Sequence, residues 1–433
     1  MYKLFIFFFL PLIAINSCKT VNPLIPEPKI SLSVEDALCT EAWLNLKTSD
    51  VSLPVNVILQ VNNTVFKKFS LLTPDSTIYL DSLLPGKNYL FKASIALGNS
   101  TYSSDNVSAL TMDTTSNNIT WQKFQFGDFP SNILFDVAVI DENNIWAGGE
   151  IHLLDSTGQR DDKPYNAVHW NGTKWEVLRI PTRIYTGEIL YAIIKAIYAF
   201  NKDDIWAFSD AGSFSHWDGK EWKSEFVWER KGGGNRFWGT SSTDLYLACS
   251  NGGLSYYNGA KWTLINTGTD LNINDIYGSW NEQTGRYDIM AVASNILESL
   301  ERKILQISGN TVTNVNSDTL NTTLSSVWFK PNKKYYVVGG GIYQKNNLNE
   351  DVWKNKHLEF THYFTYSIIG TDVNDLIAVG AYGEVLHYNG STWKSFMDET
   401  GIDGGLYSVR IKNNLIVAVG EESTKGVLFI GRR

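Results

Sequence analysis

The sequence lacks a block of positive charge, a long apolar span and a rich supply of cysteine. Its 37 Lys and Arg residues are outnumbered by 45 Asp and Glu residues, and the net charge of −8 is spread along the chain. A phosphate backbone attracts a concentrated positive field, so we expect no nucleic-acid partner. Charged residues make up only 19% of the chain, whereas aromatic residues reach 13%. This balance is typical of a β-rich protein whose aromatic side chains fill a core between sheets.

An apolar run near the N-terminus is too short to cross a bilayer as a finished span, which takes roughly 20 residues. It lies in "MYKLFIFFFLPLIAINSCKT", where Lys3 precedes the run and Cys18 follows a small residue. This pattern is typical of a secretory signal. The ending "INSC", from Ile15 to Cys18, resembles the lipobox of bacterial lipoproteins. The resemblance implies that residues 1–17 are a signal peptide and that Cys18 becomes lipidated.

The lipobox resemblance implies an exported protein of the cell envelope, an outer-membrane lipoprotein of a bacterium that meets the membrane through its N-terminal lipid. The alternative is a plain secretory signal in which Cys18 is a coincidence. The chain has three cysteines, and an unpaired exposed thiol outside the cytoplasm is a liability. Cys39 and Cys249 lie in apolar strand patterns, so we expect buried thiols and no disulfide. Residues 18–29, which are rich in proline, are expected to form an extended linker.

Residues 30–115 alternate short apolar runs with turn residues, which predicts a small β-sandwich. The candidate strands are "EAWLNLK", "LPVNVILQV", "STIYLDSL", "KNYLFKASIAL" and "NVSALTMDT". The stretch "LLPGKNYLFKASI" resembles the signature of a fibronectin type III domain, with Leu83 or Leu84, Pro85-Gly86 and Tyr89. The resemblance implies that the Tyr89 hydroxyl bonds back to the upstream backbone. Because the chain has no "RGD", we favour a spacer role for this domain over a binding role.

Two phrases recur in residues 119–433. One reads "HWNGTKW" from His169, "HWDGKEW" from His216, "YYNGAKW" from Tyr256 and "HYNGSTW" from His387. The other recurs about 40 to 60 residues apart, as "NNIWAGG", "DDIWAFS", "TDLYLAC", "YDIMAVAS", "KYYVVGG", "NDLIAVG" and "NLIVAVG". Each copy of the second phrase follows an apolar strand, and most precede the first phrase or a degraded copy of it. One period therefore holds four strands.

The seven-residue phrase predicts a hairpin between the third and fourth strands of each period. Asn-Gly or Asp-Gly between two strand patterns favours a tight turn with positive φ, and the flanking aromatics then pair across the strands. His169, His216 and His387 share one position, which is tempting as a metal site. Copies in different repeats stand far apart, however, and Tyr256 replaces the fourth histidine. We therefore expect packing or a local hydrogen bond at these positions, and no metal.

Units of four antiparallel strands at this period predict the blades of a β-propeller. The last unit stops at Arg433, before its fourth strand, whereas "ITWQKFQFG" from Ile119 resembles a fourth strand without a preceding three. Placing Trp121 beside the last unit completes the circle and pairs its edges. The predicted fold is all-β: a fibronectin type III-like sandwich, then a seven-bladed β-propeller over 119–433 with a 3+1 closure by the strand at 119–126.

The repeats resemble those of the β-propeller superfamily, and more closely those of bacterial surface propellers with "WAVG...H.NG..W" units. They lack the Gly-His and Trp-Asp pairs of WD repeats and the Asp box "SxDxGxxW" of sialidases. They also differ from kelch units in the spacing of the double glycine. Because one fold hosts many functions, the resemblance implies no particular activity.

Long connections predict which face of the propeller binds. Antiparallel order places the connections from second to third strand, and from one unit to the next, on the same face. The long segments at 150–167, 227–236, 294–303 and 357–366 all fall there. Function concentrates in loops on a rigid scaffold, so we expect this face to bind a protein or a glycan. The candidate ligand-binding residues are Arg160, Trp228, Arg230, Arg236, His362 and Tyr363. The alternative is that these segments are solvated insertions.

An enzyme, a propeller glycoside hydrolase or lyase acting on extracellular polysaccharide, is the second interpretation. Such enzymes need carboxylates or histidines that converge at the central channel. By our reading of the repeats, no carboxylate or histidine recurs at the start of the first strand, and the glycines at 232–234 lack the Lys-Ser/Thr of a phosphate loop. Two carboxylates about 5 to 10 Å apart at the channel mouth would favour the hydrolase. We expect a monomeric interaction scaffold without catalytic residues, cofactor or metal.

Overall fold

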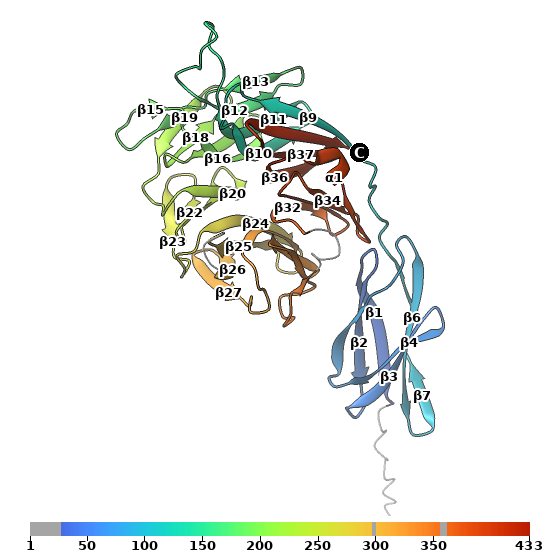
Figure 1. The fold of residues 1–433 in the computed structure, drawn as a ribbon. Helices are drawn as coiled ribbons and strands as arrows, with labels where there is room; N and C mark the ends of the chain where they lie inside the picture. The colour runs from blue at the N-terminus through green and yellow to red at the C-terminus, as the bar shows by residue number, and fades with distance from the viewer. Residues whose placement is uncertain (1–26, 297–299, 356–361) are drawn as a thin grey trace, which may run out of the picture. The chain divides into compact units, whose positions relative to one another are not determined.

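The structure is a computed structural model that describes residues 27–296, 300–355 and 362–433. It divides into two compact units, one formed by the described residues up to 37 with 41–81 and 88–110, and the other by 38–40, 82–87 and 111–433. Strands dominate both units (Figure 1). Within the described residues the only helix is the short α1 (Met397–Thr400), so no helix in this part could cross a membrane. The predicted signal peptide and Cys18 lie outside the described residues.

The first unit is a sandwich of two sheets. One has the order β1 (Lys29–Ala37), β2 (Ala42–Ser49), β5 (Asp75–Leu80), and the other β4 (Thr64–Leu71), β3 (Val55–Val61), β6 (Asn88–Leu97), β7 (Ser100–Ser103), with β8 (Val107–Leu110) also on β6. Leu44, Leu59 and Phe91 are fully buried between the sheets. The five strands that the sequence predicts are present. It does not predict β1, β4 or β7, and β4 is an edge strand with almost no buried side chain and hence no alternation.

In its described residues, the second unit contains seven sheets of four strands each, numbered in chain order. They are β10 (Ile133–Asp141), β11 (Asn144–Ile151), β12 (Tyr165–Trp170), β13 (Trp175–Leu178); β16 (Ile194–Asn201), β17 (Asp204–Ser209), β18 (Ser213–Trp217), β19 (Trp222–Phe226); β20 (Gly234–Ser241), β21 (Asp244–Cys249), β22 (Leu254–Tyr257), β23 (Trp262–Ile265); β24 (Ile273–Asn281), β25 (Arg286–Ser294), β26 (Arg302–Ser308), β27 (Thr311–Val315); β28 (Leu324–Lys330), β29 (Lys334–Gly339), β30 (Ile342–Lys345), β31 (Lys354–Asn355); β32 (Thr365–Asp372), β33 (Asp375–Gly380), β34 (Val385–Tyr388), β35 (Trp393–Ser395); and β36 (Gly405–Lys412), β37 (Leu415–Glu422), β38 (Lys425–Arg432), β9 (Thr120–Phe126). The second strand of every sheet lies in one of the recurring phrases of the "NNIWAGG" type. A hairpin that the sequence does not predict, β14 (Thr182–Arg183) with β15 (Ile189–Leu190), is inserted between sheets 1 and 2.

The first strands of the seven sheets contact one another in a circle. Each contacts the first strand of the next sheet, and β36 of sheet 7 contacts β10 of sheet 1. Apolar side chains fill the spaces between neighbouring sheets, as where Ile194 and Ile205 of sheet 2 pack with Ala138 and Trp146 of sheet 1. Burying one such aliphatic side chain contributes about 1.5–3 kcal/mol. Each sheet therefore depends on its neighbours for the burial of its faces.

Strand β9 completes sheet 7 from a distant part of the sequence. It runs antiparallel to β38, and Trp121 lies opposite Gly431. This is the pairing that the sequence predicts. A Cβ atom at residue 431 would come within 2.7 Å of the Trp121 ring, so the close approach of the two strands requires glycine. The last sheet thus consists of three C-terminal strands and one strand from the start of the unit.

The seven-residue phrase forms the hairpin between third and fourth strands. Gly172, Gly219, Gly259 and Gly390 have φ values of 86°, 88°, 87° and 95°, which other residues rarely adopt. In the first copy the Asn171 side chain accepts hydrogen bonds from the backbone N–H groups of residues 173 and 174, at 3.0 and 3.1 Å. Equivalent bonds form at Asp218, Asn258 and Asn389. The phrase is therefore a turn with its own side-chain support.

The histidines of the phrase bond to the residue that begins the second strand of the same sheet. Nε2 of His169 lies 3.0 Å from Asn144 Oδ1, and Nε2 of His216 lies 2.9 Å from Asp204 Oδ1. The His169 ring also stacks on Trp146 with centroids 4.0 Å apart. These contacts account for the histidines by packing and hydrogen bonding. In the described ranges, no group of three His, Cys, Asp or Glu side chains could hold a metal ion.

His387, which is fully buried, is the centre of a larger network. Its Nε2 lies 3.1 Å from Asp375 Oδ1, and its Nδ1 lies 2.6 Å from the side-chain oxygen of Asn117, on the segment that leads into β9. Arg433 donates to the same Asp375 carboxylate, with Nη1 2.9 Å from Oδ2. Burial by itself raises the pKa of Asp375, but the hydrogen bonds from His387 and Arg433 outweigh it and lower the pKa to about 2.

This network predicts a pH-dependent contribution to stability. Because the folded pKa of Asp375 lies below its ordinary value, the ionised carboxylate stabilises the fold above about pH 4, and this contribution is lost as the pH falls toward 2. We expect Asp375→Asn to reduce the free energy of unfolding by about 2 kcal/mol at pH 7, and by clearly less at pH 3. Urea unfolding at both pH values measures the difference. Asp270→Asn, at a carboxylate that is 93% exposed, is the control, and an equal loss at both pH values would contradict the assignment.

The two described cysteines are buried, as the sequence predicts. Cys249 packs in the core between sheets 2 and 3, where burial raises the pKa of its thiol to about 12. The Cys39 thiol donates a hydrogen bond to the carbonyl of Asp113 at 3.2 Å. Neither sulfur is part of a disulfide. Both cysteines therefore serve as small packing residues.

Candidate functional site

Every first strand of the seven sheets carries a β-bulge close to its start. The bulged residues, which we call the bulge ring, are Phe135, Lys195, Asn235, Asn274, Ser325, Tyr366 and Tyr407. They lie on the face that carries the connections from second to third strand and from sheet to sheet, which we call the connection face. A bulge re-aims a side chain out of the sheet. The ring therefore gives seven equivalent positions around the axis, which can be compared directly.

Three neighbouring side chains of the bulge ring connect adjacent sheets by hydrogen bonds. Asn235 donates from Nδ2 to the carbonyl of residue 273 at 2.9 Å, and Asn274 donates likewise to the carbonyl of residue 324 at 2.7 Å. The Ser325 hydroxyl donates to the carbonyl of residue 365 at 2.6 Å. Each side chain thus bridges its own sheet to the next one. On this side of the axis, the bulge ring acts as a belt of hydrogen bonds between sheets.

The other four positions form an aromatic arc, defined as Tyr366, Tyr407, Phe135 and Lys195. The rings of Tyr366 and Tyr407 meet edge to face with centroids 5.0 Å apart, and Tyr407 stacks on Phe135 at 6.2 Å. The ammonium of Lys195 lies over the Phe135 ring, 3.3 Å from its centroid. Phe364 extends the arc beyond Tyr366 at 5.1 Å. All of these side chains are partly exposed on the connection face, so their rings remain available to a ligand.

Carboxylates surround the arc. Glu421 accepts a hydrogen bond from the Tyr407 hydroxyl at 2.7 Å, and with burial this contact raises the pKa of Tyr407. Burial lowers the pKa of Lys195, which the charges of Asp210 and Glu150 oppose. Burial also raises the pKa of Asp210, and Glu150 raises it further against the opposing effect of Lys195. Because these groups affect one another, Lys195, Asp210 and Glu150 form one electrostatic cluster.

Below the bulge ring, a buried ionic cluster occupies the axis. Nη1 of Arg236 contacts the carboxylate of Asp136 and lies 3.0 Å from the Ser408 hydroxyl. Nε of the same guanidinium lies 3.4 Å from Asp275. Burial lowers the pKa of Arg236, but Asp136 and Asp275 more than offset this and the net shift is upward. Arg410 brings a second guanidinium within 3.4 Å of Asp136. Sheets 1, 3, 4 and 7 thus meet in a network of paired charges.

This cluster corrects two expectations from the sequence. Arg236, predicted as a ligand-binding residue, is only 7% exposed and is held by two carboxylates inside the ring of sheets. Its role is therefore structural. The expectation that no carboxylate recurs at the start of the first strand is also wrong, because Asp136 and Asp275 occupy equivalent positions directly after their bulges. Both accept a backbone N–H from the next sheet, at 3.0 and 3.1 Å.

The other predicted binding residues lie on three different connections of the connection face. Nη2 of Arg160 lies 2.8 Å from His152 Nδ1, and His152 in turn contacts Glu150. Trp228 is 68% exposed and packs on Phe226 at 4.7 Å.

Arg230, on the same connection as Trp228, lies 5.3 Å from the Phe226 ring, which also contacts Tyr185 of the unpredicted hairpin. Tyr363 packs on Tyr382 at 5.0 Å, and His362, its neighbour, is exposed. None of these predicted residues is a member of the bulge ring.

The residues of the arc are not among those predicted from the sequence, although a signal for them exists. Aligning the first strands on their bulges gives the triplets "LFD", "IKA", "GNR", "IND", "LSS", "TYS" and "LYS", from residue 134 to residue 408. The middle letter is the bulged residue, and it is aromatic in three triplets and Lys in a fourth. The pattern is visible only when the seven first strands are aligned to the exact residue, because a bulge shifts the alternation of a strand by one residue.

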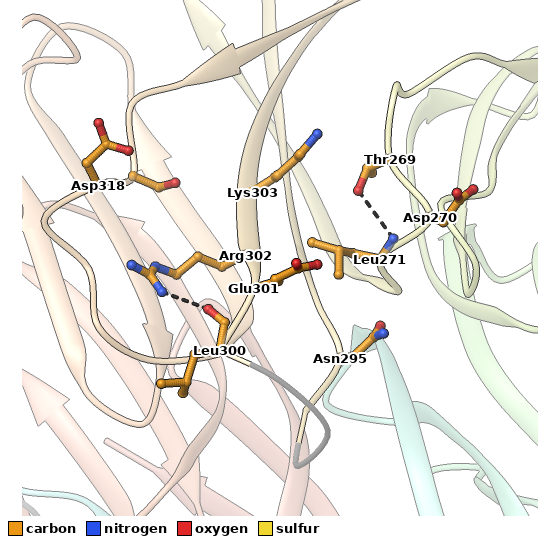
Figure 2. Close-up of a pocket in the computed structure, with 10 residues that line it drawn as sticks. Thr269, Asp270, Leu271, Asn295, Leu300, Glu301, Arg302, Lys303 and Asp318 are labelled. Atoms are coloured by element: carbon orange, nitrogen blue, oxygen red, sulfur yellow. Dashed lines mark hydrogen bonds between the residues drawn. The ribbon is translucent and has the colours of Figure 1, made fainter.

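A separate hollow of about 790 Å³ lies farther out on the connection face, among residues near Leu271, Asn295 and Asp318. Figure 2 shows Arg302 turned toward the carbonyl of Leu300, and the two atoms are 2.7 Å apart. Lys303 donates to the carbonyl of residue 268 at 3.0 Å. Since both cations are bonded to this chain's own backbone, the hollow offers weaker recognition chemistry than the arc. None of the residues that the sequence predicts for binding lines it.

Comparison with known proteins gives a fold and no family. No family model matches the chain, and no curated relative matches its sequence. Solved structures do match it. One is described as YCF48 bound to D1 peptide, with a TM-score of 0.52 and 14% identity over 72% of this chain and 95% of that one. Another is YCF48 from Cyanidioschyzon merolae, with a TM-score of 0.51 and 14% identity over 72% of this chain and 98% of that one. At this identity the similarity shows the fold alone: the chain is all-β and β-propeller-like.

Proposed function

We propose that this chain is an exported, lipid-anchored interaction protein of the cell envelope. In this proposal residues 1–17 are a signal peptide, Cys18 carries the lipid, and a fibronectin type III-like domain spaces a seven-bladed propeller from the outer membrane. A single propeller then binds a protein partner through its connection face. The repeated phrases, the seven sheets and the position of β9 support the propeller part. The lipobox resemblance at 15–18 supports the anchor.

The aromatic arc is the observation that carries the binding function. Four of the seven positions in the bulge ring give up the sheet-to-sheet bridge that Asn235, Asn274 and Ser325 make. They present three rings and an ammonium at the centre of the connection face instead. Aromatic anchors at the centre of a surface, with polar groups around them, are typical of binding hot spots. A protein partner also agrees with the solved structure of similar fold that is described as bound to a peptide.

Site-specific photocrosslinking tests the connection face. A photoreactive amino acid replaces Tyr363, which is 38% exposed on this face, or Tyr287, which is 44% exposed at the opposite face. In cells that make this protein, we expect a discrete, protease-sensitive adduct from position 363 and none from position 287. Adducts of equal yield at both positions, or none at 363 together with none at position 228, would reject a partner on this face. An adduct that resists protease would indicate a glycan in place of a protein.

Glycoside hydrolysis or lyase chemistry is the second candidate function, and one observation favours it. Asp210 has a raised pKa beside a second carboxylate, Glu150, with Lys195 near both. A carboxyl group with a raised pKa beside a second carboxyl group is the arrangement that general acid catalysis of sugar cleavage uses. Release of new sugar ends from an extracellular polysaccharide, abolished by Asp210→Asn and retained by Asp270→Asn, would establish an enzyme in place of the scaffold.

A further inference from the structure

The aromatic arc already holds one cation, and it belongs to this chain. The Lys195 ammonium lies 3.3 Å from the centre of the Phe135 ring. The negative face of an aromatic ring attracts a cation, and the attraction strengthens when the pair is partly removed from water. Lys195 is partly buried, and burial lowers its pKa. At this end of the arc, an aromatic face therefore already binds an ammonium group.

The other end of the arc offers the same chemistry with no cation of this chain described on it. Tyr366 and Tyr407 meet at 5.0 Å and an angle of 66° between their ring planes, so that they form the two walls of a corner. Glu421 lies beside this corner, bonded to the Tyr407 hydroxyl at 2.7 Å. Burial raises the pKa of Tyr366, and the charge of Glu421 raises it further, so this carboxylate acts on both residues of the corner. Two ring walls and a carboxylate are the elements of a site for a cationic side chain.

The charge around the arc favours a positive ligand. Among the described side chains that contact the arc or act on its charges, the carboxylates are Glu150, Asp210 and Glu421, whereas the cations are Lys195 and, through His152, Arg160. The buried cluster below the ring adds two arginines and two aspartates, which balance each other. Carboxylates therefore outnumber cations even when Arg160 is counted. An acidic ligand would face like charges, which is unfavourable at a contact surface, and a basic one would be steered toward it. Charge and ring geometry thus select the same class of ligand.

From these observations we infer that the partner presents a lysine or arginine side chain from a basic peptide segment, and that its cation docks in the outer corner formed by the touching rings of Tyr366 and Tyr407, with Glu421 as counter-charge. This inference rests on the proposed function, because it names the chemistry of the partner at the connection face. Lys195 on Phe135 fixes the position of the neighbouring ring and closes the arc on that side. The segment then runs over the connection face, where Glu150 and Asp210 are its further charge complements.

Peptide binding tests the inference directly. The probe is a fluorescent nonapeptide of glycine and serine with three lysines, compared with versions that carry norleucine or glutamate in place of lysine. Binding to the chain from residue 19 onward is measured by fluorescence polarisation. We expect the lysine peptide to bind about tenfold more tightly than the norleucine version, because norleucine keeps the aliphatic stem and loses the charge. The preference should shrink as salt is added, since exposed charges are screened.

Variants of the arc locate the binding. We expect Tyr407→Leu and Glu421→Gln each to weaken lysine-peptide binding about tenfold, whereas Tyr407→Phe keeps the ring and stays within about twofold of the native affinity. Trp280→Ala, at a ring that is 50% exposed on the opposite face, is the matched control and should change nothing. Circular dichroism and melting temperature must be unchanged in all four variants.

Two outcomes overturn the inference. One is equal binding of the lysine and norleucine peptides. The other is lysine-peptide binding that Tyr407→Leu leaves intact. Neither outcome touches the photocrosslinking result at position 363, so a partner without a docking cation would be recognised as such. Lysine-peptide binding at the arc with no adduct at position 363 and none at position 228 would instead support the cation site and reject the wider partner surface.

Discussion

A chain without the closing strand should not fold to a monomer. If the protein begins at Gly127, β38 loses β9, its partner on one side. The seven residue pairs between these two antiparallel strands disappear. The rings of Phe124 and Phe126 also leave the Trp175 ring, on which both now pack at about 5.5 Å. A domain is stable by only about 5–15 kcal/mol in total, so a lost strand with its aromatic contacts removes most of that margin. We expect aggregation and no cooperative unfolding, measured by light scattering and urea titration.

The matched control begins at Ser116 and keeps the closing strand while it also lacks the first unit. This chain should unfold cooperatively and elute as a monomer. Adding a synthetic peptide of residues 117–127 to the shorter chain should restore both properties, because the peptide supplies the missing neighbour of an exposed strand edge. A stable monomer that starts at Gly127 and gains nothing from the peptide would show that the circle of sheets does not need β9.

Replacing Arg236 should damage the fold more than any ligand contact. Arg236→Met removes one partner from a buried network and leaves Asp136 and Asp275 with only Arg410 to offset them. Breaking a buried ion pair from one side costs about 3–5 kcal/mol, because a charge remains buried without its partner. We expect the free energy of unfolding to fall by about that amount in urea titration at pH 7.

Two further variants identify the cause of the loss. Arg230→Met, at a guanidinium over the Phe226 ring, should change stability by less than about 1 kcal/mol. Adding Asp275→Asn to Arg236→Met should recover part of the loss, since Asp136 then remains paired with Arg410 and no buried charge is left without a partner. If Arg236→Met has no more effect than Arg230→Met, the axis is not held by paired charges.

The repeats made much of the second unit predictable. The Asn-Gly turns, the second strands and the pairing of Trp121 with the C-terminal strand follow from local patterns, because turn chemistry and alternation act over a few residues. The hairpin at 182–190 was not predictable in this way. Its strands are two residues long, and its apolar side chains, Ile189 and Leu190, are 41% and 40% exposed, so it has no buried pattern.

The candidate site depended on contacts that sequence patterns do not contain. Arg236 read as a loop arginine because it follows three glycines, yet its partner Asp136 lies 100 residues earlier in the chain. Tyr407 and Phe135 read as ordinary strand residues, because only the bulges turn them out of their sheets and only the ring of sheets brings them together. Arg160, Trp228 and Tyr363 are exposed, because long connections lie at the surface, and their role in binding stays a prediction.

The bonds of the segment before β9 bear on how the molecule would respond to tension. Thr115 donates to the carbonyl of residue 374 at 2.5 Å, and Asn117 bonds to the buried His387, so this segment is fastened to sheet 6 before it enters sheet 7. A pull on the N-terminal side would first strain these side-chain bonds. It would reach the hydrogen bonds between β9 and β38 only after these bonds had broken. The two side-chain bonds would therefore shield the seam that completes the circle from the pull.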